Sequence, residues 1–230
     1  MSLIDWKIMK NYKKLVLAFI FCCVSVFAAN AKTNYVNGLI TLKSGEKIEC
    51  MIDDATFYAD KVKYRLSPKD KEKKLLQTDI HTIVFPDDEG NYSVLENIAY
   101  VSSKNYLKGE VKKLDYGMKN VVEYGDVSLF RFSVKEYEGA SWMSTTHYYT
   151  CRKKGVDYGV SVGYILVLPQ GITKKKVLIK TKGDLEDLCQ TFFGDYPDLC
   201  KQIREKKLTM ENIEDIVHEY NVYKAEKSGK

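Results

Sequence analysis

Hydrophobic and polar residues alternate along most of the chain between residues 35 and 168, and this period of two predicts β-strands. The first two strands flank Lys43–Glu46, where Gly45 can adopt the positive φ that a tight hairpin turn needs. The predicted strands are 35–42, 47–53, 61–66, 81–85, 92–101, 120–123, 127–134, 147–152 and 160–168. Short strands at this spacing are typical of a small barrel or of meander sheets.

After Gly183 the hydrophobic period changes to that of an amphipathic helix. Apolar residues recur at helical spacing in two sets, Leu185, Leu188, Cys189 and Phe192, then Ile213, Ile216, Val217 and Tyr220. We expect Asp195 to cap a short middle helix that begins near Pro197, and Thr209 to cap the last helix. The predicted fold is α+β, an antiparallel β-rich body followed by a three-helix tail.

The beginning of the chain has the three parts of a secretory signal peptide. An uncharged apolar run of 13 residues, Leu15 to Phe27, falls short of the ~20 residues that span a bilayer. Ala29 and Ala31 supply the small residues of a cleavage site, which predicts a mature chain beginning at Lys32. Four lysines precede the apolar run, Lys7, Lys10, Lys13 and Lys14.

We therefore expect a signal peptide at 1–31, an N-terminal β domain at 32–118, a second β section at 119–180 and a helical segment at 181–230. Translation can start at Met1 or at Met9, which begins a more conventional signal. The alternative to cleavage is a short membrane anchor. With cleavage, the protein is exported to the periplasm or the outer cell surface and keeps no transmembrane span.

Loss of the signal peptide also changes the charge. It removes four lysines and one aspartate, so the net charge falls from +5 to +2. Such a small and evenly distributed charge argues against a nucleic-acid partner. The 17 tyrosines suit the half-buried faces of an exported β-sheet.

Four cysteines remain in the predicted mature chain, Cys50, Cys151, Cys189 and Cys200. An even number permits two disulfides in an oxidising compartment, and four cysteines allow three connectivities. We expect Cys189 to pair with Cys200, because they lie closest in sequence. The alternative is that all four are buried free thiols.

No motif for a cofactor or a metal occurs in the sequence, so we expect neither. His147 and Cys151 lie four residues apart, which on a strand separates their Cα atoms by ~13 Å, too far for a catalytic dyad. A thiol-dependent hydrolase that uses Cys151 with a histidine from elsewhere is the enzymatic alternative. The favoured function is a non-catalytic binding or structural module that contacts an envelope protein or a glycan through Trp142, Tyr148 and Tyr149.

Two resemblances agree with this interpretation. The pattern G-x-I-x-L-x-S-G-E-x-I-x-C-x-I from Gly38 to Ile52 resembles the opening hairpin of SH3-like and Sm-like small barrels. Together with the signal peptide and the stretches Tyr124–Arg131, Phe192–Leu199 and Ile216–Asn221, it is similar to a loose group of exported Bacteroidota proteins of unknown function. That resemblance implies a Gram-negative envelope setting and brings no catalytic residues.

Overall fold

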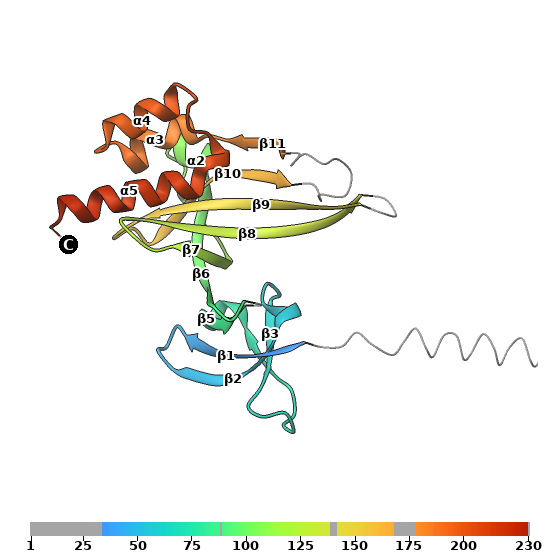
Figure 1. The fold of residues 1–230 in the computed structure, drawn as a ribbon. Helices are drawn as coiled ribbons and strands as arrows, with labels where there is room; N and C mark the ends of the chain where they lie inside the picture. Colours follow the sequence, from blue (N-terminus) through green and yellow to red (C-terminus); the bar gives the residue numbers. More distant parts are fainter. Residues whose placement is uncertain (1–33, 88, 139–141, 168–177, 230) are drawn as a thin grey trace, which may run out of the picture. The chain divides into compact units, whose positions relative to one another are not determined.

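The computed structural model describes residues 34–87, 89–138, 142–167 and 178–229. The predicted signal peptide at 1–31 and the last residue of the predicted strand 160–168 lie outside these residues. Residues 35–230 form one compact unit. Within it, the strands form a single eleven-stranded sheet with the order β11-β10-β9-β8-β7-β6-β5-β1-β2-β3-β4 (Figure 1).

Four of the first five strands, β1, β2, β3 and β5, agree with the predicted strands. The hairpin of β1 (Tyr35–Leu42) and β2 (Lys47–Asp53) turns at Gly45, whose φ is +91°. Three strands follow, β3 (Lys61–Arg65), β4 (Lys73–Leu76) and β5 (Ile80–Pro86). Their inward residues form one hydrophobic core, which includes Ile40, Ile52, Val62 and Ile83.

Strand β6 connects this part of the sheet to the remaining strands. Its first half pairs with β5, through Tyr92–Glu96, and its last residues pair in parallel with β10, through Ala99–Ser102. Five consecutive strands form the second part of the sheet, β6 (Tyr92–Ser102), β7 (Asp115–Glu123), β8 (Val127–Glu138), β9 (Trp142–Lys153) and β10 (Tyr158–Val167). Each pairs with the next, so the β10–β6 ladder closes these five strands into a small barrel.

The C-terminal helices cover one face of β8–β10. They are α3 (Leu185–Phe193), α4 (Pro197–Arg204) and α5 (Ile213–Lys227), with a 3-10 turn, η3 (Met210–Asn212), before α5. Their apolar residues pack with alternate strand residues, including Leu129, Cys151 and Val162, in a second core. The fold is therefore α+β with a β-rich body, as the sequence pattern predicts.

The two predicted helix caps have different outcomes. Thr209 begins a capping box at η3, in which its hydroxyl accepts from the backbone N–H of Glu211. Asp195 was the wrong cap for α4, because the residue at that position is Tyr196 and no side chain caps the helix. The Asp195 carboxylate instead accepts from Tyr220 and Lys224 of α5.

Three regular elements have no counterpart among the predicted ones, namely β4, the short helix α2 (Ser103–Leu107) and β11 (Leu178–Gly183). The expected boundary between 118 and 119 falls inside β7, so the sheet is continuous across it. Among the described residues, none of the helices has the length and apolar character needed to cross a membrane.

Helix α5 is attached to the turn between β7 and β8 through the side chain of Asn221. The Asn221 amide accepts from the N–H of Val127 at 3.0 Å and donates to the carbonyl of Val127 at 2.9 Å. It also donates to Glu123 Oε1 at 2.8 Å. Gly125 is required beside it, because a Cβ at that position would lie 2.3 Å from Asn221 Cγ.

Candidate functional site

An aromatic row crosses β8, β9 and β10 where these strands continue beyond the closed part of the barrel. Tyr148 pairs with Phe132 on one side and with Tyr164 on the other, so the three side chains share one face. The centroid of the Tyr148 ring lies 6.5 Å from that of Phe132 and 5.7 Å from that of Tyr164. Tyr58 adds a fourth ring, which meets the Phe132 ring edge-on with 5.1 Å between the two centroids. We call these four side chains the aromatic row.

The same face of the strands forms the inside of the barrel, where charged side chains lie. Glu96 on β6 and Arg152 on β9 form an ion pair, with 2.7 Å between Oε1 and Nη1. Because β6 and β9 are not neighbours in the ring, this contact crosses its interior. The second Glu96 oxygen accepts from the Tyr124 hydroxyl at 2.7 Å. A pocket of about 420 Å³ opens beside the ion pair, but both Glu96 oxygens already have partners, so we interpret the pair as structural.

Lys119 lies on the inward face of β7, next to the aromatic row. It is buried, with its Nζ 3.9 Å from the Tyr100 ring centroid and 5.8 Å from that of Phe132. Burial lowers the pKa of this ammonium to about 8. The aromatic rings replace part of the hydration that the charge loses. Lys119 thus lies beneath the row and is not available at its surface.

The residues predicted to bind a partner do not form one surface. Tyr148 is 42% exposed and lies in the middle of the aromatic row. Tyr149 points to the opposite face, because neighbouring strand residues alternate, and it is buried under α5 with its hydroxyl donating to Glu214 at 2.9 Å. Burial first, and then this hydrogen bond, raise the pKa of Tyr149 to about 12. The contact role expected of Tyr149 was therefore wrong, and the side chain of Trp142 lies outside the described residues.

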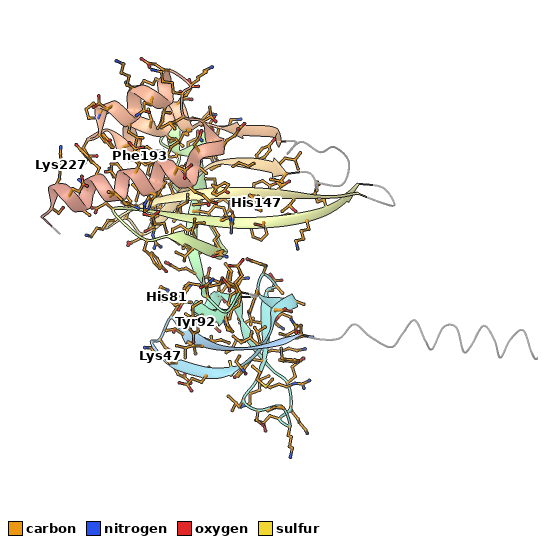
Figure 2. The ribbon with its side chains drawn as sticks, in the orientation of Figure 1. Lys47, His81, Tyr92, His147, Phe193 and Lys227 are labelled. Atoms are coloured by element: carbon orange, nitrogen blue, oxygen red, sulfur yellow. The ribbon has the colours of Figure 1, made fainter. Side chains whose placement is uncertain are left out.

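Cys151 has the environment of a core residue. It is fully buried among apolar side chains, and burial raises the pKa of its thiol. His147, labelled on β9 in Figure 2, has Ser133 Oγ as its partner, 2.8 Å from Nδ1. Burial, together with the nearby Arg131 charge, lowers the pKa of His147. Because Cys151 is enclosed and this imidazole is occupied by Ser133, the geometry gives no support to a Cys151 nucleophile.

Cys189 and Cys200 are neighbours at the junction of α3 and α4. Both are buried free thiols in the structure, and Cys200 Sγ lies 3.2 Å from the carbonyl oxygen of Cys189. Burial raises the pKa of Cys200 to about 11, and the adjacent Cys189 contributes in the same direction. The structure thus brings these two side chains together, and their oxidation to a disulfide stays a prediction.

Within the described ranges, no group of three or more histidine, cysteine, aspartate or glutamate side chains is arranged to hold a metal ion. At the end of β5, Asp87 Oδ1 accepts from the N–H groups of Glu89 and Asn91, so this carboxylate serves a polar turn.

Sequence reasoning missed Phe132 and Tyr164 as partners of Tyr148, and Tyr58 as the partner of Phe132. Phe132 and Tyr164 lie in predicted strands, but only the strand register shows that they flank Tyr148, and the contact of Tyr58 is tertiary. In comparisons with known proteins, no family model, no curated protein and no solved structure matches this chain.

Proposed function

We propose that the protein is an exported, non-catalytic module of the cell envelope that binds a partner through the aromatic row. The observation that carries this proposal is the position of Tyr148. This residue is 42% exposed in a sheet face where the neighbouring rings are already packed together. Rigid aromatic side chains with few rotatable bonds lose little entropy when they are covered, so they are good contact residues.

Export is supported by the signal-peptide pattern of residues 1–31. The intact mass of protein recovered from the envelope fraction tests it, and the expected chain begins at Lys32. Recovery with residues 1–31 still attached contradicts export by cleavage.

The thiol-dependent hydrolase is the less favoured function. A reactive cysteine needs an accessible thiol and an environment that lowers its pKa. Cys151 has neither, since burial encloses it and raises its pKa. We therefore assign Cys151 a packing role in the second core.

The binding role is tested by replacing Tyr148 and a matched tyrosine outside the row. Tyr92 is that control, because it is exposed at the start of β6 (Figure 2) and is not among the four rings. Wild-type protein, Tyr148→Ser and Tyr92→Ser are immobilised and incubated with solubilised envelope material, and the retained protein and sugar are measured.

We expect Tyr148→Ser to retain at least about tenfold less of the partner, the loss typical of a contact residue worth ~1.4 kcal/mol or more. Tyr92→Ser should behave as wild type. Equal retention by Tyr148→Ser and wild type contradicts the proposed binding face.

A further inference from the structure

Strand β2 has an open edge over its first half. On one side it pairs with β1 from Lys47 to Asp53, and on the other side β3 pairs with Met51 and Ile52 alone. Within the described part of the chain, no strand therefore pairs with the outer edge of residues 47–50. Figure 2 labels Lys47 at the start of this edge.

The hairpin register shows which backbone groups this edge presents. The N–H of Leu42 donates to the carbonyl of Glu46, and the pairing of β1 with β2 continues in the same register. Hydrogen-bonded and non-hydrogen-bonded positions alternate in an antiparallel pair, so Ile48 bonds to β1 as Glu46 does. Lys47 and Glu49 therefore direct their N–H and C=O groups away from β1, toward the open edge.

Two charged side chains accompany these backbone groups. Lys47 and Glu49 are both exposed, and they share one face of the sheet because they lie two residues apart. Neither forms an ion pair with another described residue. An open edge is a template for a further strand, and these two charges restrict which strand fits it.

A second copy of β2 satisfies both the backbone groups and the charges. When two such edges pair antiparallel about a two-fold axis at Ile48, Lys47 of each copy lies opposite Glu49 of the other. Both residues direct their backbone groups outward, so the two opposed pairs exchange four main-chain hydrogen bonds. Opposite charges directly across a strand pair attract each other, which adds two ion pairs.

The neighbouring registers lack this complementarity. A two-fold axis at residue 47 sets two lysines opposite each other, and an axis at residue 49 sets two glutamates opposite each other, which is unfavourable in both cases. The edge of β4 also suits a second copy poorly, because Lys73 and Lys74 of two copies would bring four lysines together. Charge therefore selects both the β2 edge and its register.

We propose that the protein forms a two-fold dimer in which the β2 edges of two copies pair antiparallel, with Lys47 opposite Glu49. Because four hydrogen bonds and two ion pairs make a small interface, the dimer is reversible, with an expected Kd of about 10 μM or weaker. This interface lies on a different strand from the aromatic row, so either proposal can fail without the other.

Sedimentation velocity of the full chain over a range of protein concentrations measures the dimer. Lys47→Glu and Glu49→Lys each place like charges across both opposed pairs, and each should weaken the dimer at least about tenfold. Combining the two substitutions in one chain exchanges the charges and should restore the dimer, as should mixing the two single variants. Lys73→Glu on the β4 edge is the matched control and should dimerise as wild type.

Amide hydrogen exchange, followed residue by residue by NMR, tests the backbone pairing itself. The N–H groups of Lys47 and Glu49 should exchange more slowly at high protein concentration than at low concentration. The N–H of Ile48 should change little, because it is already bonded to β1. Circular dichroism shows that each variant is folded.

A wild-type chain that remains monomeric at the highest concentration at which it is soluble overturns the proposal. Self-association that Lys47→Glu or Glu49→Lys leaves unchanged also overturns it. If both single variants lose the dimer and the double variant does not regain it, the proposed register is wrong.

Discussion

Replacing Asn221 with alanine should destabilise the helical layer, because this side chain makes three hydrogen bonds from α5 to the sheet, in addition to the apolar contacts of the helix. The Asn221 side chain pairs with Val127 as the backbone of a neighbouring strand would. It accepts from the N–H of Val127 and donates to its carbonyl. Its third hydrogen bond reaches the Glu123 carboxylate. Alanine removes all three and leaves the partly buried groups of Val127 without a partner.

The expected magnitude follows from those groups. A buried backbone donor or acceptor that loses its partner costs about 1–3 kcal/mol, and a hydrogen bond to a charged group is at the upper end of the usual range. Water can reach the partly exposed Glu123 carboxylate, so the loss of this hydrogen bond costs less free energy than the loss of a buried one. We therefore expect Asn221→Ala to lower the free energy of unfolding by about 2–3 kcal/mol, or the melting temperature by about 4–12 °C for a chain of this size.

Urea unfolding followed by circular dichroism measures this change. The matched control is Val222→Ala, the adjacent residue on α5, which is exposed and should change stability by less than about 0.5 kcal/mol. An Asn221→Ala variant within about 0.5 kcal/mol of wild type refutes the reasoning.

Gly125 provides a second, independent check of the same contact. Because a Cβ at Gly125 would meet the Asn221 side chain, Gly125→Ala should destabilise wild type and cost much less in the Asn221→Ala background. Additive effects in this double-mutant cycle would show that the two residues do not meet.

Two further predictions concern buried groups. Burial lowers the pKa of Lys119 from 10.5 to about 8, so between these pH values the unfolded chain binds a proton that the native protein has lost, and the contribution of Lys119 to stability rises with pH. Lys119→Met should remove this rise and stabilise the protein at pH 7, which urea unfolding at pH 7 and pH 9 will show; an unchanged pH dependence contradicts the assignment. Cys189 and Cys200 should form a disulfide in protein recovered from an oxidising compartment. An alkylating reagent should then label neither cysteine in the denatured protein, and label both only after reduction. Labelling of both without reduction contradicts the pairing.

The strands and helices could be predicted because their hydrophobic periods are regular. The residues Tyr35–Leu42 and Lys47–Asp53 have the same bounds in the sequence pattern and in the structure. The β4 strand Lys73–Leu76 was missed because its pattern is short and rich in lysine. Closure of the barrel was also beyond local patterns, since it depends on a parallel pairing between residues 99–102 and 158–161.

The candidate site could be predicted only in part, for a related reason. Alternation places Tyr148 and Tyr149 on opposite faces, but the sequence does not show which face the helices cover. The row became visible only with the register that sets Phe132 and Tyr164 beside Tyr148. Asp195 similarly looked like a helix cap, and a distant contact with Tyr220 and Lys224 determines its role instead.

The central claim is that the surface around Tyr148 contacts a partner in the envelope, and site-specific photocrosslinking tests it most directly. A photoreactive phenylalanine derivative is placed at position 148 or, as a control, at position 92, and cells are irradiated before fractionation. The account predicts a discrete crosslinked product from position 148 that position 92 does not give. The absence of a product from position 148, or the same product from both positions, contradicts it.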